Sequence, residues 1–329
     1  MRDIKWGILG CGKIAHKFAS DLKLVEGAVL FAVGSTDAGR AKNFSEQYGF
    51  QHAFDSYKAL CESDVDVIYV ATPHGFHFEH VQLCLNHNKA VLCEKAFTLN
   101  LRQTEQLISL SREKGIFMME AFWTKFVPQY RQVVKMIADG VIGEIKMITA
   151  DFGFKSPEPK PQRLYDPILG GGALLDIGIY PVFLAQSLLG EPESVSAVMS
   201  PYTTGVDEQI AMTLKFSGGA LASLNASFAA ETPVEAFICG TLGKIYMSPR
   251  FHNPSTTIYL ELNGQPRAAV NVPLESGFGY QYEARHVQDC LQQGLKESPV
   301  LTLQDTSNLM RTLDRIRAAC GIVYHQDNL

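Results

Sequence analysis

Three short clusters in this sequence combine residue types that could hold a cofactor and move a proton. The first is Gly10-Cys11-Gly12-Lys13-Ile14-Ala15, a G-x-G-x-x-A turn that directly follows the apolar run from Ile4 to Leu9. The glycines would let the backbone approach a pyrophosphate, and the free N–H groups of a following helix would attract its charge. The order of strand, turn and helix predicts a dinucleotide site that uses Gly10, Gly12, Lys13 and Ile14.

The end of the next apolar run, residues 28–34, bears on which dinucleotide would bind. Ser35 and Thr36 follow it, and Arg40 comes one helical turn later. A carboxylate at this point favours NAD, whereas hydroxyls and a cation suit the 2′-phosphate of NADP. These residues therefore favour NADP, with NAD possible. Asp37 could bind the ribose or cap the helix that begins there, and the sequence leaves both roles open.

The second and third clusters carry the candidate proton-transfer groups. Glu94 and Lys95 end the apolar run 90–93, at the edge where open α/β sheets bind ligands, although a surface ion pair is the alternative. Asp176 and Tyr180 follow the glycines at 170–172 and are four residues apart, so they share one face of a predicted helix. Such a pair also arises by chance.

Other catalytic patterns are missing or weaker. No Tyr is followed by Lys four residues later, and the seven scattered Cys residues contain no C-x-x-C pair, which argues against a zinc site. His74, His77 and His80 are spaced by three residues and could suggest a metal on a helix. His74 and His77, however, fall with Thr72 and Pro73 in a loop after the apolar run 66–71, where they are better placed to meet a cofactor or substrate. No metal is predicted.

The elements that must position these residues alternate between apolar runs and helical patterns over the first 120 residues, which indicates a parallel sheet covered by crossover helices. Six strands are predicted in this part: 4–9, 28–34, 52–54, 66–71, 90–93 and 116–119. Later strands follow one another with turn signals between them and predict an open antiparallel sheet. These strands are 144–154, 193–200, 209–216, 220–228, 234–239, 244–247, 257–261 and 267–272.

Helix signals complete an α/β fold with a doubly wound parallel sheet and a second α+β domain. Helices are predicted at 38–48 before Gly49, after Asn100 up to Gly115, and at 128–138, 173–189 and 282–291. A last helix begins at Thr302, which forms a capping-box pattern with Asp305. We predict domains 1–122 and 123–329, with the C-terminal helices able to pack back on the first domain.

Composition excludes several classes of protein. The 329 residues are 46% hydrophobic and carry a formal charge of −5 with no basic run, so binding to nucleic acid is not expected. No stretch of about 18 apolar residues lacks charges, and Ile4 begins the first apolar run too early for a signal peptide. Scattered cysteines suit a reducing compartment. We expect a cytoplasmic protein with no membrane span.

The chain resembles the glucose-fructose oxidoreductase / inositol dehydrogenase (Gfo/Idh/MocA) family, and within it the dimeric dihydrodiol dehydrogenase branch, which also oxidises D-xylose with NADP. The resemblance covers nearly the whole chain. It rests on the N-terminal glycine turn, Ala71-Thr72-Pro73, Glu94-Lys95, the stretch 119–124, the G-G-G-x-L-x-D-x-G-x-Y helix 170–180, Gly205-Val206-Asp207, Gly240-Thr241, and the segments 282–286 and 295–300.

This resemblance implies a Rossmann domain, an NADP cofactor, a sugar or cyclic diol as substrate, and a homodimer formed through the C-terminal sheet. It implies that Lys95 and Tyr180 are the catalytic pair and that Trp123 lines the substrate pocket. In a hydride-transfer mechanism of this kind, Asp176 could orient the substrate hydroxyls or tune Tyr180. Two positions depart from the branch pattern. Ala96 stands where the family has Pro, and Thr36 stands where the branch tends to have an Arg for the 2′-phosphate.

Alternative functions use the same residues. One is reduction of a ketose or an anhydro-sugar in the opposite direction. Another is a non-catalytic dinucleotide-binding regulator, against which the intact set Lys95, Asp176 and Tyr180 argues.

Overall fold

The computed structural model describes residues 2–328, which divide into two compact units. The first unit contains the residues up to Trp123 together with residues 275–307, and the second contains residues 124–274 together with those from 308 onwards. Residues 275–307, which contain one of the C-terminal helices, therefore group with the first unit. Each unit is described below by itself.

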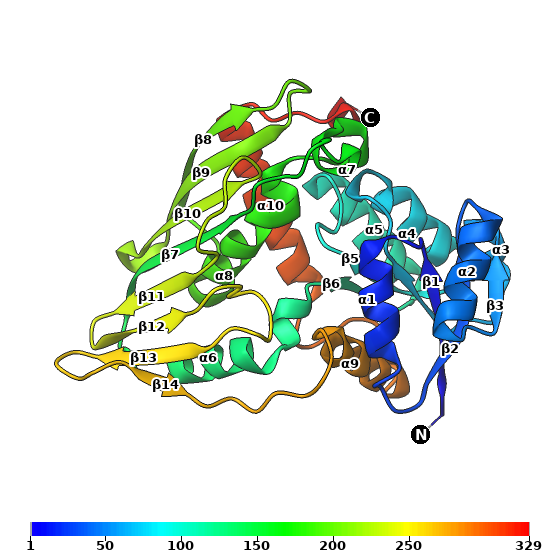
Figure 1. Ribbon diagram of the computed structural model, residues 1–329, viewed down its shortest axis with the longest axis horizontal. Helices are drawn as coiled ribbons and strands as arrows, with labels where there is room; N and C mark the ends of the chain where they lie inside the picture. The colour runs from blue at the N-terminus through cyan, green and yellow to red at the C-terminus, as the bar shows by residue number, and fades with distance from the viewer. Residues whose placement is uncertain (1, 329) are drawn as a thin grey trace. The chain divides into compact units, whose positions relative to one another are not determined.

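The first unit is built on a six-stranded sheet in which every strand pair is parallel, and the predicted doubly wound sheet is confirmed (Figure 1). Its strands are β1 (Ile4–Leu9), β2 (Ala28–Gly34), β3 (His52–Phe54), β4 (Val67–Val70), β5 (Ala90–Glu94) and β6 (Met118–Ala121). The spatial order is β3-β2-β1-β4-β5-β6. Strands β1 to β3 are added in one direction from β1, and β4 to β6 are added in the other, so the strand order reverses between β1 and β4. Open α/β sheets bind ligands at such a switch point.

Five helices connect these strands, and a sixth from later in the chain, α9 (Tyr280–Gln292), belongs to the same unit. The connecting helices are α1 (Lys13–Leu22), α2 (Ala38–Tyr48), α3 (Tyr57–Glu62), α4 (His77–Asn86) and α5 (Leu101–Lys114), of which α2 and α5 end at the predicted glycines. Gly49 and Gly115 end α2 and α5 with positive φ values of 84° and 60°, a conformation that costs glycine little. Asn100 caps α5 by accepting a hydrogen bond from the backbone of Gln103.

Helix α9 belongs to the first unit because its N-terminus is held by Asp21 of α1. The buried Asp21 carboxylate accepts hydrogen bonds from the backbone N–H groups of Phe278, Gly279 and Tyr280 at 2.8–2.9 Å. These groups have no backbone partner within the helix, although Gly279 also donates to the Gln281 side chain at 2.9 Å. The carboxylate therefore satisfies them and complements the helix dipole.

The second unit is built on an eight-stranded sheet in the order β14-β13-β12-β11-β7-β10-β9-β8 (Figure 1). Its strands are β7 (Ile145–Gly153), β8 (Ser194–Pro201), β9 (Asp207–Lys215), β10 (Leu221–Ser227), β11 (Ala236–Gly240), β12 (Gly243–Met247), β13 (Ile258–Leu262) and β14 (Ala268–Val270). The sheet is mixed and not wholly antiparallel as predicted, because β7 and β10 pair in parallel. A parallel pair needs a long connection, which the helical segment and the β8–β9 pair provide here.

The remaining helices lie largely in the second unit. They are α6 (Pro128–Ala138), α7 (Gln162–Tyr165), α8 (Ile179–Leu189) and α10 (Leu303–Cys320), the last of which begins in the first unit. The predicted helix 173–189 begins as a π-helical turn, Leu174–Gly178, that continues into α8. Residues 167–189 are the one described segment long and apolar enough to cross a membrane, and most of it is buried.

The eight-stranded sheet has one covered face and one exposed face. Helix α8 packs on β7 and β10. Side chains alternate accordingly, because Ala222 and Leu224 are buried whereas Leu221, Ser223 and Asn225 are exposed.

Candidate functional site

The turn between β1 and α1 has the geometry that a pyrophosphate requires. Gly10 adopts a φ of 99°, and a Cβ there would lie 3.0 Å from the Thr72 side chain and 3.1 Å from the Ala71 carbonyl oxygen. Gly12 precedes the first turn of α1, and no side chain caps the helix there. The N–H groups of that turn, which includes Lys13 and Ile14, thus suit an anion. The residues present fit a dinucleotide.

The end of β2 gathers the groups predicted to choose between NAD and NADP. The Asp37 side chain accepts a hydrogen bond of 2.6 Å from the backbone N–H of Arg40, so it is the N-cap of α2. The Ser35 hydroxyl accepts one from the backbone of Asp37 at 3.2 Å. The Arg40 guanidinium lies 3.4 Å from the Thr36 hydroxyl, and its side chain is 64% exposed. A cation and two hydroxyls thus stand together, and the capping carboxylate is engaged by the backbone.

His77 connects the ends of β4 and β5. It is fully buried, with Nε2 2.8 Å from the Thr72 carbonyl oxygen and Nδ1 2.9 Å from the Ala96 carbonyl oxygen. Burial lowers the pKa of His77 despite these two carbonyls. Its ring thus lies between the backbone after β4 and the backbone after β5 and contacts both.

Thr72 and His74, in the segment between β4 and α4, also lie against other protein groups. The Thr72 hydroxyl lies 2.9 Å from Nδ1 of His80, whose pKa burial lowers to about 4. Pro73 precedes the short helix His74–Phe76, in which His74 is buried. Among residues 2–328 no group of three metal-ligating side chains is present.

Glu94 and Lys95 lie at the carboxyl end of β5. Glu94 is buried and accepts hydrogen bonds from the Tyr69 hydroxyl and, at 3.2 Å, from the backbone N–H of Lys95. Lys95 itself is only partly buried. Glu94 therefore fixes the backbone of Lys95, and the Lys95 side chain is the more accessible of the two.

Trp123 ends the first unit and stacks on an aromatic ring of α9. Its ring and that of Tyr280 are 4.7 Å apart with an interplanar angle of 14°. Since Asp21 holds the first residue of α9, it also fixes the ring on which Trp123 rests.

Asp176 and Tyr180 lie in the second unit, on the π-helical turn and the first turn of α8. Asp176 forms a bidentate pair with Arg163 of α7, with N–O distances of 2.9 and 3.2 Å. The half-exposed Arg163 guanidinium thus orients the carboxylate and balances its charge. Sequence reasoning missed Arg163, because nothing in the proline-rich loop signals a partner on the next helix.

Tyr180 is buried within an aromatic cluster. Its ring centroid lies 4.6 Å from that of His252 and 5.7 Å from that of Phe152, and the Phe152 and His252 rings stack at 4.5 Å. The Thr124 hydroxyl holds the His252 backbone by a 2.8 Å hydrogen bond to its carbonyl. His252 is a second residue that the sequence analysis missed, since a lone His between two strands carries no motif.

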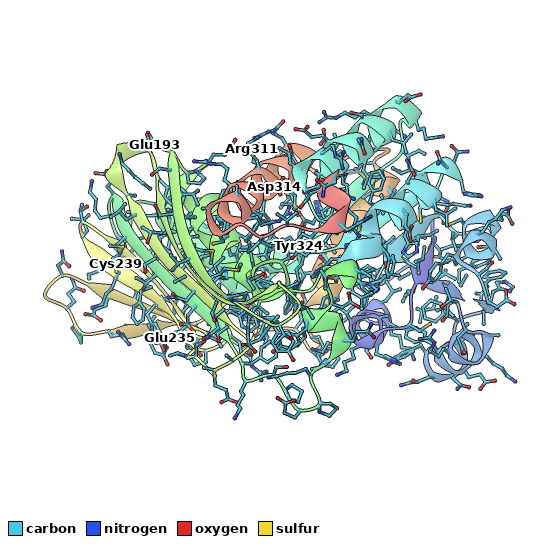
Figure 2. All side chains as sticks on the ribbon, turned by 90° about the horizontal axis from the view of Figure 1, so that it is seen from above. Glu193, Glu235, Cys239, Arg311, Asp314 and Tyr324 are labelled. Atoms are coloured by element: carbon cyan, nitrogen blue, oxygen red, sulfur yellow. The ribbon has the colours of Figure 1, made fainter. Side chains whose placement is uncertain are left out.

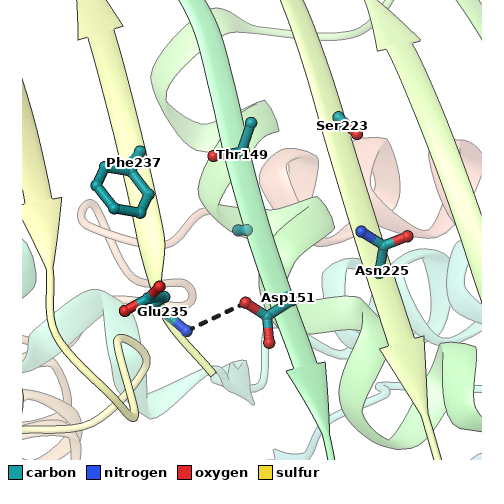
Figure 3. Close-up of a pocket in the computed structure, with 7 residues that line it drawn as sticks. Thr149, Asp151, Ser223, Asn225, Glu235 and Phe237 are labelled. Carbon is teal, nitrogen blue, oxygen red and sulfur yellow. Dashed lines mark hydrogen bonds between the residues drawn. The ribbon is translucent and has the colours of Figure 1, made fainter. Parts of the chain in front are cut away.

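The exposed face of the second sheet carries a shallow cavity of about 320 Å³ that contains none of the predicted site residues (Figure 3). It is lined by Thr149, Ala150, Asp151, Ser223, Asn225, Glu235 and Phe237. Asp151 is engaged there by the backbone of Val234, at 2.8 Å, and of Glu235. This cavity is separate from the cluster around Tyr180.

The predicted site residues are thus divided between the units. The first unit holds the glycine turn, Ser35, Thr36, Arg40, Thr72, Pro73, His77, Glu94, Lys95 and Trp123, and the second holds Asp176 and Tyr180. In the first unit they lie at the carboxyl ends of β1, β2, β4, β5 and β6 or in the segments that follow them, and in the second unit they lie on one helix.

Two family models match the chain. The model described as an oxidoreductase family with an NAD-binding Rossmann fold matches residues 4–122, and the model of the GFO/IDH/MocA C-terminal domain matches residues 130–246.

Similar proteins match over nearly the whole chain. The trans-1,2-dihydrobenzene-1,2-diol dehydrogenase of Xenopus tropicalis is 38% identical over 332 residues, which cover 97% of this chain and 99% of that protein. The enzyme of the same name from Danio rerio is 37% identical, with 99% of each chain covered. A 3-ketoreductase from Actinomadura kijaniata, solved with NADP and TDP-benzene, is 29% identical with a TM-score of 0.88, and 97% of this chain and 98% of that one are covered.

Proposed function

Because this chain belongs to the GFO/IDH/MocA family of NAD-binding oxidoreductases, we propose that it oxidises a secondary alcohol of a trans-dihydrodiol or of a sugar such as D-xylose, with NADP as its cofactor. It is a nicotinamide-dependent enzyme of the dehydrogenase and reductase class. The observation that carries the proposal is the glycine turn at the switch point of the first sheet, where Gly10 leaves space that a Cβ would fill.

The first unit supplies the residues that would hold the cofactor. Gly10 and Gly12 with the N–H groups of Lys13 and Ile14 would bind the pyrophosphate, while Ser35, Thr36 and Arg40 would bind the 2′-phosphate. Thr72, Pro73 and Glu94 would line the nicotinamide side, and His77 would hold the backbone there. When bound, NADP supplies the hydride acceptor that the side chains lack.

Tyr180 is the group we propose as the base that takes the hydroxyl proton of the substrate. A free phenol has a pKa near 10 and needs a neighbouring cation to act at neutral pH. We propose Lys95 for that role, and Asp176, held by Arg163, as the residue that orients the substrate hydroxyls. Trp123 would form an apolar wall of the substrate pocket.

Measuring reduced nicotinamide by absorbance tests this proposal. NADP is mixed with trans-dihydrodiols, D-xylose and other sugars, and the reverse reaction is followed with the corresponding ketones and ketoses. We expect turnover with at least one cyclic diol or sugar. No turnover in either direction across the panel would refute the substrate class.

Variants test the proton-transfer pair. Tyr180→Phe should lower turnover by about 10² to 10⁴ fold and leave NADP affinity nearly intact. Tyr259→Phe on β13 is the matched control for loss of a phenol. If Lys95 and Tyr180 act in one step, the double variant Lys95→Met with Tyr180→Phe should lose little more turnover than either single variant. Fully additive losses of turnover would show that the two residues act independently.

We further propose that the exposed face of the second sheet forms a homodimer. The face carries apolar side chains with large exposed fractions, namely Met147 at 37%, Leu221 at 37% and Val198 at 71%. Light scattering should give twice the chain mass, and Leu221→Glu should give a monomer. A wild-type monomer at micromolar concentration would overturn this.

A cytoplasmic location is proposed on the seven free cysteines, and cell fractionation tests it.

A further inference from the structure

In the Gly170–Gly172 turn, which precedes the helix with Asp176 and Tyr180, Gly171 and Gly172 leave no room for a side chain. A Cβ on Gly171 would lie 2.8 Å from the Leu164 carbonyl oxygen. Gly172 has a φ of 122°, and a Cβ on it would overlap the Asp207 carboxylate. The backbone of this turn is therefore in close contact with three other segments, which contain Leu164, Asp207 and Tyr324.

Asp207, the first residue of β9, forms a hydrogen bond with the start of the helix that carries Asp176 and Tyr180. It is fully buried, and its Oδ2 accepts a hydrogen bond of 2.6 Å from the backbone N–H of Leu174. This N–H lies in the first turn of the helix, where it has no partner within the helix, so the carboxylate fixes the direction in which the helix leaves the turn. Asp207 belongs to the Gly205-Val206-Asp207 motif, for which the proposed reaction supplies no role.

Tyr324, near the C-terminus, also holds this turn through a hydrogen bond to its backbone. The buried Tyr324 hydroxyl donates a hydrogen bond of 2.7 Å to the Gly171 carbonyl oxygen. Figure 2 labels Tyr324 in the segment after α10 and Asp314 on α10.

Arg317 of α10 anchors that segment. Its guanidinium lies over the Tyr324 ring at 4.7 Å and pairs with Asp314 and Asp327. Asp327 in turn accepts a hydrogen bond of 2.8 Å from the Tyr324 backbone. The tyrosine is thus held from three directions.

We propose that Asp207 and Tyr324 are positioning residues for the reaction, which hold the Gly170–Gly172 turn and thereby set where Asp176 and Tyr180 stand. This inference rests on the proposed function of Tyr180. Both residues act on the backbone at one end of a helix, and Tyr180 lies two turns further along. A small rotation at the turn moves the phenol, and misplacing a catalytic group by about 1 Å can cost about 10² fold in rate.

The hydrogen bond between Asp207 and the Leu174 N–H should also depend on pH. Burial raises the pKa of Asp207 to about 7, against the opposing effects of the Leu174 N–H and the Arg317 guanidinium. The other titratable groups that face it are Cys320 of α10 and Tyr324. The ionised carboxylate is the stronger acceptor for the Leu174 N–H. This hydrogen bond should therefore weaken as the pH falls below about 7 and Asp207 takes up a proton.

The experiment compares Tyr324→Phe, Asp207→Asn and Asp207→Ala with Tyr180→Phe and with Tyr202→Phe as a control outside the turn. We expect turnover to fall about tenfold or more in Tyr324→Phe and Asp207→Ala, with NADP affinity changed by less than about twofold. Asp207→Asn should retain more activity than Asp207→Ala, because its amide oxygen can still accept the hydrogen bond from the Leu174 N–H. Its kcat should also lack the change near pH 7 that titration of Asp207 causes in the wild type. Backbone hydrogen exchange at residues 172–176 should speed up in Tyr324→Phe.

Two outcomes separate this inference from the proposed function. If Tyr180→Phe is inactive while Tyr324→Phe and Asp207→Ala keep wild-type kcat and only melt at lower temperature, the positioning inference is overturned alone. If Tyr180→Phe keeps wild-type turnover, the proposed role of Tyr180 fails and the inference fails with it.

Discussion

Replacing Glu120 with glutamine should remove one distinct contribution to the pH dependence of stability in the first unit. Glu120 of β6 is buried and accepts hydrogen bonds from the backbone of Phe97 at 3.2 Å and the hydroxyl of Thr306 at 3.0 Å. Burial raises its pKa from 4.5 to about 7 although these bonds act in the opposite direction. The fold therefore prefers the protonated acid.

The sign and size of the effect follow from proton linkage. Between pH 4.5 and 7 the folded state binds a proton that the unfolded state releases, so wild-type stability falls as the pH rises through this window. At 1.36 kcal/mol for each pH unit, the total is about 3 kcal/mol, of which about 2.5 kcal/mol falls between pH 5 and pH 8. Glutamine keeps an acceptor for Phe97 and cannot ionise.

Urea unfolding followed by tryptophan fluorescence measures this directly. The two tryptophans, Trp6 and Trp123, are buried and both belong to the first unit. The unfolding free energy of Glu120→Gln should rise relative to wild type by about 2.5 kcal/mol from pH 5 to pH 8. Glu113→Gln, on the exposed side of α5, is the control and should show no such trend. Parallel pH curves for Glu120→Gln and wild type would refute the reasoning.

Three further predictions concern single contacts. Asp21→Ala removes the Asp21 acceptor from three N–H groups at the start of α9, of which only that of Gly279 keeps a second acceptor, and should lower the unfolding free energy of the first unit by about 2 kcal/mol or more, by the same fluorescence assay; a loss under about 0.5 kcal/mol would contradict it. Arg40→Ala should raise KM for NADP about 10 to 100 fold and leave KM for NAD nearly unchanged, and equal changes in steady-state rates would exclude a 2′-phosphate contact. Arg163→Gln leaves the charge of Asp176 unbalanced near Tyr180 and should move the pH dependence of turnover to higher pH; an unshifted profile would exclude this electrostatic role.

Local signals predicted the elements closely because each signal acts over a few residues. The strands at 4–9, 28–34 and 52–54 and the helices at 38–48 and 128–138 have the predicted bounds. Thr302 and Asp305 form the predicted capping box, with reciprocal hydrogen bonds of 2.8 and 3.1 Å. The predicted strands 209–216 and 220–228 correspond to β9 and β10, which pair antiparallel as expected for an antiparallel sheet.

Pairings between distant segments escaped prediction. The sequence offers no signal that β10 lies parallel to β7, because strand order depends on how all eight strands pack on one covered face. For the same reason the sequence did not connect Arg163 with Asp176 or place His252 beside Tyr180. Strand β6 extends two residues beyond its predicted end, which puts the polar Glu120 inside the sheet.

The sequence by itself determined the order of strands and helices, the glycine turn after β1 and the chemical types of the candidate site residues, because apolar periodicity, caps and turns are encoded within about one element length. Tertiary structure decided which of these residues are exposed, which are paired and which titrate near neutral pH. Glu120 and Asp207 have ordinary carboxyl side chains, and only burial by residues remote in the chain raises the pKa of each to about 7. Solvation and pairing depend on what surrounds a group in space, and the neighbours along the chain do not specify that environment.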